Sequence, residues 1–177
     1  MTQIPTIETA RLALRPHRVG DFEAYAAMWT DPTVVRFIGG EPMSREVSWS
    51  RFLRQAGIWH LLGFGFFAVE DRATGAFAGE CGFHDLHRAM TPSIEGTMET
   101  GWALLPAFHG QGLAEEAMRA CLAWAEAHGT GDRLTAIIDP GNEPSLRLAR
   151  RLGFAERTLA TYRDNPIVLL ERPRRGA

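Results

Sequence analysis

The chain of 177 residues contains no lysine, and all 19 of its basic residues are arginine. Several chemistries depend on a lysine amine: the phosphate contact of a Walker A loop, the Schiff base with pyridoxal phosphate or a carbonyl substrate, and the strand lysine of protein kinases. The absence of lysine excludes all three. A phosphate-binding site in this chain therefore lacks the lysine of a Walker A loop, and ATP hydrolysis is disfavoured.

Cysteine and long apolar runs are also scarce. The two cysteines, Cys81 and Cys121, stand in apolar surroundings and do not suggest a disulfide framework. No run reaches the roughly 18 apolar residues of a membrane span, and residues 1–10 lack the basic leader and apolar core of a signal peptide. We therefore expect a cytoplasmic protein with no membrane association.

The overall composition is that of one globular domain. Hydrophobic residues make up 45% of the chain and charged residues 23%, which is ordinary for a soluble protein. A formal net charge of −2 gives no general basis for nucleic-acid binding. We expect a single domain over residues 1–177 that buries a full core.

Periodicity and end signals predict strands interrupted by helices. The predicted strands are 9–16, 65–70, 77–83, 97–104 and 134–138, with a terminal hairpin over 154–172. The predicted helices are 21–30 with Asp21 as N-cap, 44–62 with Ser44 as N-cap, about 113–128, and 142–152. Residues 173–177 look frayed. This order predicts an α+β fold with a mainly antiparallel sheet.

The most informative stretch is Glu99–Ala117, which reads as a strand, a glycine-bearing loop and the first turn of a helix. Gly110 and Gly112 let the backbone approach a ligand without an intervening Cβ atom. The N–H groups of residues 110–114 belong to a helix start, where they have no intrahelical partner. Such a terminus binds anions, so the stretch predicts a phosphate cradle.

A second motif follows at Asn142–Phe154. Asn142 is a natural N-cap, Pro144 stands in the first turn and Gly153 lies just past the end of the predicted helix. The cap by itself requires no catalytic role.

Together the two motifs resemble the GNAT superfamily of acyl-CoA N-acyltransferases, and more closely its RimJ/RimL-type branch, whose members acetylate protein N-termini or small amines. The family pattern Arg/Gln-x-x-Gly-x-Gly/Ala falls on residues 109–114 and departs only at His109. The resemblance extends from Glu8 to about Phe154. It implies splayed central strands flanked by about four helices, acceptor-side helices within about 21–62, and an acyl-CoA-binding core within about 97–154.

The resemblance also implies acetyl-CoA as co-substrate and no metal. The pantetheine arm would pair with the strand 99–104, and the pyrophosphate would lie on the helix start. The implied binding residues are Trp102, Ala103, Leu104, His109, Gly110, Gln111, Gly112, Leu113, Ala114, Asn142 and Ser145. The alternative is an ordinary strand-to-helix turn without a ligand.

Three residues are candidates for proton transfer. By resemblance, the Ser145 hydroxyl points towards the thioester sulfur and protonates the leaving thiolate; alternatively it only bonds the helix start. Many family members carry a tyrosine for this step where this chain has Ala149. Glu99 and Glu80 are candidates to take the proton of the amine, or each is a structural carboxylate held by arginine.

Other polar residues carry weaker signals. His84 and His87 are too few for a metal site, and solvated loop residues are the preferred interpretation. Arg147, Arg150 and Arg151 either face solvent or include a partner for the CoA 3′-phosphate.

The sequence thus predicts an enzyme that transfers acetyl from acetyl-CoA to a primary amine by direct attack, the amine being a protein N-terminus or a small molecule. Because Ala149 stands where many family members carry a tyrosine, the alternative interpretation is an acyl-CoA-binding regulatory module that has lost catalysis. A nucleotide-binding protein is disfavoured because the loop lacks the third glycine of a dinucleotide fingerprint. A homodimer is compatible with the sequence, and the acceptor is not determined by it.

Overall fold

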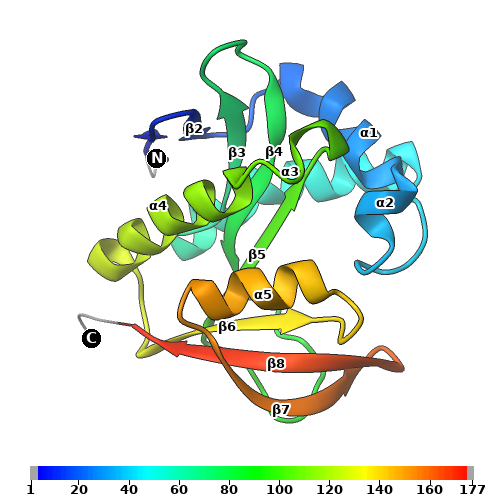
Figure 1. Cartoon of the computed structure of the whole chain (residues 1–177), viewed down its shortest axis with the longest axis vertical. Helices are drawn as coiled ribbons and strands as arrows, with labels where there is room; N and C mark the ends of the chain where they lie inside the picture. The colour runs from blue at the N-terminus through cyan, green and yellow to red at the C-terminus, as the bar shows by residue number, and fades with distance from the viewer. Residues whose placement is uncertain (1–3, 175–177) are drawn as a thin grey trace.

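A computed structural model describes residues 4–174. Its centre is an eight-stranded sheet with the order β1-β2-β3-β4-β5-β6-β8-β7, in which only the β5–β6 pair is parallel (Figure 1). The strands are β1 (Ile7–Glu8), β2 (Leu12–Arg15), β3 (Phe66–Asp71), β4 (Phe77–His84), β5 (Met98–Leu104), β6 (Arg133–Ile138), β7 (Ala155–Tyr162) and β8 (Asn165–Pro173). The predicted α+β fold with a mainly antiparallel sheet is confirmed.

The helices are α1 (Phe22–Thr30), α2 (Pro32–Val35), α3 (Arg45–Leu62), α4 (Leu113–His128) and α5 (Glu143–Arg151), with short 3-10 turns at Val19–Asp21 and Pro106–Phe108. The four long helices match the predicted ones. Helix α2 was not predicted because four residues carry no periodic signal. Its N-cap, Asp31, accepts a hydrogen bond of 2.8 Å from the Thr33 N–H.

The helices lie on both faces of the sheet. Helices α4 and α5 cover one face, in front in Figure 1, while α1 and α3 cover the other. On the α4 face, Cys81 of β4 meets Cys121 with their sulfur atoms 3.6 Å apart. Both cysteines are free and buried, and burial raises the pKa of the Cys81 thiol well above its usual value.

The sheet opens between its two parallel strands. Only Met98–Leu134 and Glu99–Thr135 pair across β5 and β6, although β5 continues to Leu104 and β6 to Ile138. Beyond this point β5 stays paired with β4, and β6 stays paired with β8. The facing edges of β5 and β6 therefore present backbone N–H and C=O groups that no neighbouring strand uses.

Two predictions about the chain ends need correction. The strand predicted over 9–16 begins only at Leu12, because the backbone turns at Thr9, whose N–H donates to the Leu12 carbonyl at 2.8 Å. The frayed end predicted from Pro173 is wrong for Pro173 and Arg174. Pro173 ends β8, and the Arg174 N–H and side chain donate to the carbonyls of Asp132 and Gly131. Residues 175–177 lie outside the described part.

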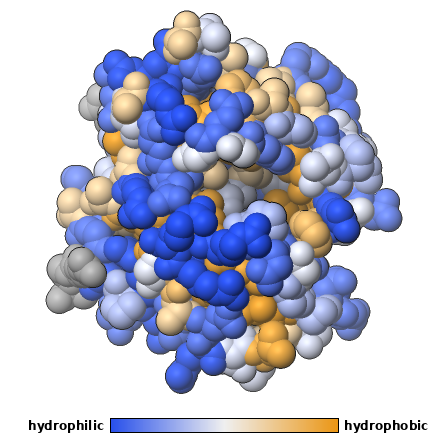
Figure 2. Space-filling model, viewed as in Figure 1, coloured by the Kyte–Doolittle hydropathy of each residue, from blue (hydrophilic) through white to orange (hydrophobic). Residues whose placement is uncertain are grey.

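The surface in front of the opening is uneven in polarity. Figure 2 shows hydrophilic residues gathered over α5 and a paler, recessed strip between them and the upper half of the molecule. The recessed strip lies over the region where β5 runs between α4 and α5 in Figure 1.

Candidate active site

The loop before α4 has the backbone geometry of an anion cradle. Gly110 and Gly112 have φ angles of 72° and 74°, in the left-handed region that favours glycine. The first turn closes with the Glu116 N–H donating to the Gly112 carbonyl at 3.1 Å. The N–H groups at 113–115 therefore have no intrahelical acceptor, and they share the positive end of the helix dipole.

Three hydrogen bonds hold this loop from outside the cradle. His109 Nε2 contacts the Leu104 carbonyl at 2.8 Å, and the Gln111 side chain donates to the Ala107 carbonyl at 2.8 Å. Arg11 donates to the Gln111 carbonyl at 2.9 Å. Because both side chains, His109 and Gln111, bond to nearby backbone, the N–H groups of the loop remain the groups available to an anion.

Glu116 anchors the first turn of α4 to the start of β2. Its carboxylate accepts hydrogen bonds from the Thr9 hydroxyl at 2.7 Å, the Arg11 N–H at 2.8 Å and the Arg11 Nε at 2.7 Å. Desolvation alone would raise the pKa of Glu116, but these bonds outweigh it and hold the pKa below its usual value. The carboxylate thus stays ionised and keeps Arg11 in place.

Helix α5 begins beside the open edge of β6. The Asn142 side chain accepts a hydrogen bond of 3.3 Å from the Ser145 N–H, so Asn142 is the N-cap. The Ser145 side chain is half-buried, and its hydroxyl has no hydrogen-bond partner within residues 4–174. Ala149 is fully buried and offers no polar group. The hydroxyl of Ser145 is therefore free to meet a ligand lying between the strands.

Glu99 stands where β5 and β6 separate. Its side chain is almost completely buried and accepts hydrogen bonds from Arg88 Nε at 2.6 Å and Arg88 Nη2 at 2.8 Å, while His84 Nε2 lies 3.1 Å from its Oε1. Desolvation would raise the pKa of Glu99, but the bonds from His84 and Arg88 lower it overall. Glu99 is thus an ionised carboxylate with both oxygen atoms occupied.

Glu80 belongs to a separate polar cluster under α1 and α3. It is fully buried; Gln55 Nε2 donates to its Oε2 at 2.9 Å, His17 Nε2 lies 3.3 Å away, and Arg51 Nη2 lies 3.8 Å from Oε1. The Tyr25 hydroxyl, Gln55 Oε1 and Glu80 Oε1 have no hydrogen-bond partner in the described chain. Two effects raise the pKa of Tyr25: burial is the larger, and the nearby negative charge of Glu80 is the smaller. Unpartnered buried groups are unusual and mark a place for water or a polar ligand group.

The register of β4 and β5 explains why the two carboxylates do not meet. His84 pairs with Glu99, and Glu80 pairs with Ala103, so both carboxylates lie on the α1/α3 face of the sheet. They are separated by four residue positions, about 13 Å along a strand. Of the predicted proton acceptors, only Glu99 lies at the point where the strands part.

His84 departs from its prediction as a solvated loop residue. It is the last residue of β4, and its side chain is only 13% exposed, whereas the His87 side chain is 68% exposed. Sequence reasoning missed His84 because its pairing with Glu99 depends on strand register.

Within residues 4–174, no group of three or more His, Cys, Asp or Glu residues is arranged to hold a metal ion. No helix in this range is long and apolar enough to cross a membrane.

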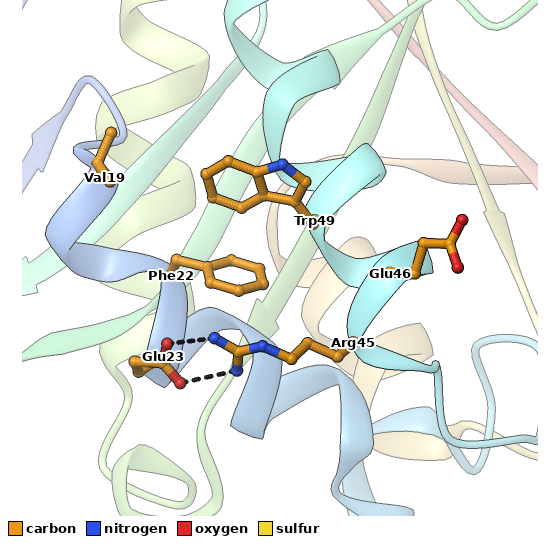
Figure 3. Close-up of a pocket in the computed structure, with 6 residues that line it drawn as sticks. All are labelled: Val19, Phe22, Glu23, Arg45, Glu46 and Trp49. Carbon is orange, nitrogen blue, oxygen red and sulfur yellow. Dashed lines mark hydrogen bonds and ion pairs between the residues drawn. The ribbon is translucent and has the colours of Figure 1, made fainter.

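A surface hollow of about 640 Å³ lies on the outside of α1 and α3 (Figure 3). It is lined by Val19, Phe22, Glu23, Arg45, Glu46 and Trp49. Arg45 spans the hollow and donates to both carboxylate oxygens of Glu23, at 2.6 and 2.9 Å. This ion pair occupies both carboxylate oxygens of Glu23. The hollow is distinct from the opening between β5 and β6.

A sheet that opens between two central strands, beside a helix start framed by glycines, places the protein in the class of GNAT-fold acyltransferases. Residues 11–155 match the family model described as "Acetyltransferase (GNAT) domain", and the chain belongs to this family.

Similar proteins agree with this assignment. The chain is 28% identical over 156 residues to an uncharacterized N-acetyltransferase, p20, of Bacillus licheniformis, covering 87% of this chain and 84% of the relative. A putative GNAT-family acetyltransferase structure from Bordetella pertussis superposes with a TM-score of 0.83 at 33% identity, covering 95% and 99% of the two chains. RimL, a ribosomal L7/L12 α-N-protein acetyltransferase in complex with coenzyme A, shares the fold with a TM-score of 0.79 at 15% identity, covering 98% and 100%.

Proposed function

We propose that the protein transfers an acetyl group from acetyl-CoA to a primary amine, either the N-terminus of a protein or a small-molecule amine. The observation that carries this proposal is the opening between β5 and β6, which ends beside the cradle at the start of α4. An amide-bearing chain can pair with an open strand edge as another strand would, while the cradle accepts phosphate groups.

The residues present fit such a ligand. We propose that the backbone of Trp102, Ala103 and Leu104 pairs with the pantetheine arm, and that the backbone of residues 109–114 holds the pyrophosphate. Asn142 and Ser145 would line the other side. Each exposed arginine of α5 already has a carboxylate partner within 4.0 Å, namely Glu143, Glu156 or Glu115. We therefore assign Arg147, Arg150 and Arg151 no role in binding.

Bound acetyl-CoA would supply a thioester carbonyl to the attacking amine. In the proposed reaction the amine nitrogen forms a bond to the carbonyl carbon, and the bond from carbon to sulfur breaks. The Ser145 hydroxyl gives its proton to the leaving sulfur and regains one from the nitrogen of the new amide. The proton that an ammonium must lose before attack passes to a base, for which Glu99 and Glu80 are the candidates. Residues 21–62 would form the acceptor side and residues 97–154 the acyl-CoA side.

The likeness in fold to RimL supports an N-terminal amine as one acceptor class, and we propose a RimJ/RimL-type enzyme on this basis. A cytoplasmic location and a homodimer stay predictions, which localisation and sedimentation measurements would decide.

The test is release of CoA thiol when the protein is mixed with acetyl-CoA and a panel of amines that includes N-terminal peptides, amino acids and polyamines. Cys81 and Cys121 are fully buried, so the protein's own thiols should contribute little background. Thermal melts with CoA, ATP and NAD provide a separate measure of binding, since a ligand at a hundredfold excess over Kd adds about 2.7 kcal/mol of stability.

Acetylation of at least one amine, with stabilisation by CoA and not by ATP, is the expected result. Stabilisation by CoA without turnover of any amine would instead indicate the regulatory module. An equal shift from ATP would overturn the acyl-CoA assignment.

A further inference from the structure

His84, which is largely buried, and Glu99, which is buried, form a pair beside the point where β5 and β6 separate. They are directly opposite each other in the β4–β5 ladder, with His84 Nε2 3.1 Å from Glu99 Oε1. The imidazole stacks on the Phe66 ring with centroids 5.2 Å apart and an interplanar angle of 13°. Strand pairing, stacking and the carboxylate contact together fix both the position and the orientation of the ring.

The two ring nitrogens of His84 have different surroundings. Nε2 faces an ionised carboxylate, which accepts hydrogen bonds, so Nε2 carries the proton in the neutral ring. Nδ1 makes no hydrogen bond to any residue from 4 to 174, and it is not among the enclosed, unpartnered polar atoms of that range. The nitrogen that faces away from Glu99 therefore holds a lone pair that no residue from 4 to 174 uses, and this nitrogen is not fully enclosed.

The charged groups around His84 come from several elements. Glu99 lies on β5, and Arg88, in the loop after β4, donates two hydrogen bonds to Glu99 and places Nη2 3.4 Å from His84 Nε2. Tyr162 of β7 lies under Arg88, whose guanidinium carbon is 4.7 Å from the ring centroid. Arg54 of α3 lies within electrostatic range of Arg88. Arg88 neutralises much of the charge of Glu99, which makes that carboxylate a poor proton acceptor.

We propose that His84 Nδ1, rather than a carboxylate, takes the proton of the acceptor amine, and that Glu99 is a positioning residue that orients the ring and stabilises the imidazolium. This inference rests on the proposed acetyl transfer. The ammonium proton passes to Nδ1, and the neutral amine then forms its bond to the carbonyl carbon as the bond to sulfur breaks. The sulfur takes the Ser145 proton, the Ser145 oxygen takes the second proton that the nitrogen loses, and the imidazolium later releases its proton to water.

The experiment compares His84→Gln, Glu99→Gln and, as a control, His87→Gln, which alters an exposed histidine of the same segment. The turnover number kcat at saturating acceptor is measured from about pH 5.5 to 9.5, with CoA stabilisation measured for every variant. His84→Gln should lower kcat by about 10²- to 10³-fold and remove the acidic limb of the profile, leaving CoA binding unchanged. Glu99→Gln should keep the limb but move its midpoint to lower pH, because the imidazolium loses its carboxylate partner.

The opposite pattern, in which Glu99→Gln removes the limb and His84→Gln only shifts it, would overturn the assignment in favour of Glu99. A second readout does not depend on activity: nitrogen NMR of the wild-type histidines, assigned with His84→Gln, should show the neutral ring of His84 protonated at Nε2. Protonation at Nδ1 would also refute the proposal. A wild-type protein that binds CoA but acetylates no amine, with His84 protonated at Nε2, would refute the proposed function and His84 as its base, while leaving the geometry of the pair intact.

Discussion

Arg11 donates a hydrogen bond of 2.9 Å from its guanidinium to the carbonyl oxygen of Gln111, the residue between the two left-handed glycines of the cradle. The same guanidinium is held by Glu116 at 2.7 Å. The segment before β2 is thereby joined both to the loop and to the first turn of α4. The cradle is consequently held in shape by a residue that lies outside the proposed CoA contacts.

Replacing Arg11 with alanine should therefore weaken CoA binding. Loss of one partly exposed hydrogen bond is worth about 0.5 to 1.5 kcal/mol, which corresponds to roughly a 2- to 13-fold increase in Kd. Isothermal calorimetry measures the change. Arg45→Ala, which breaks the exposed pair with Glu23 on the outside of α1 and α3, is the matched control. Equal Kd values for the two variants would show that the loop needs no support from Arg11.

Gly112→Ala should separate backbone strain from loss of binding. Gly112 and Gly75 have φ angles of 74° and 73°, and an added Cβ atom would meet only Arg11 Nη2 at 3.8 Å in the first case and nothing within 4 Å in the second. Both substitutions should cost about 1 to 2 kcal/mol of stability from the left-handed backbone. Only Gly112→Ala should also weaken CoA binding, since its methyl group would occupy the cradle. A similar loss of CoA affinity in Gly75→Ala would contradict this account.

Ser145→Ala tests the proposed donor to the sulfur. The backbone N–H that bonds Asn142 is retained in this variant, so the helix cap should survive. We expect kcat to fall by roughly 10- to 1,000-fold, with little change in Kd for CoA. Asn142→Ala should instead mainly lower the stability of the fold, by about 1 kcal/mol, because the helix cap is lost. Full kcat in Ser145→Ala, when chemistry is rate-limiting, would reduce Ser145 to a helix-start residue.

Asp21→Asn should change how stability depends on pH. Asp21 receives two hydrogen bonds from the buried Arg15, at 2.7 and 2.8 Å. Desolvation would raise the pKa of Asp21, but Arg15 lowers it overall, so its contribution to stability is present above the ordinary carboxyl pKa and is lost as the pH falls. At pH 7 the variant should lose about 1.5 to 3 kcal/mol, because Arg15 loses one charged partner but keeps Glu70, whose Oε2 lies 2.6 Å from Arg15 Nε.

Denaturant titrations at pH 7 and about pH 3 measure this effect, with the exposed Asp164→Asn as the control. The difference between wild type and Asp21→Asn should shrink at the lower pH. A difference that stays constant across the range would show that the Asp21 charge contributes nothing to stability.

Local signals in the sequence were sufficient for most secondary elements. Ser44 caps α3 by accepting from the Val47 N–H at 3.2 Å, and Asn142 caps α5, both as predicted. Asp21 was also predicted as a cap, yet its carboxylate binds Arg15 and the Arg18 N–H instead of α1. A nearby buried guanidinium, which a cap signal does not reveal, competes successfully for that carboxylate.

The sequence by itself determined the four long helices and the glycine loop, and it carried the resemblance that suggested Ser145 and Glu99 as candidates, because caps, alternation and glycine positions act over a few neighbouring residues. Only the tertiary structure decided where β5 leaves β6, and that Glu99 is shared by Arg88 and His84 while Glu80 is enclosed under α3. These relationships depend on strand register and on packing between residues far apart in the chain. Register follows from the burial of whole strand faces, so it arises only when the sheet and its helices assemble together.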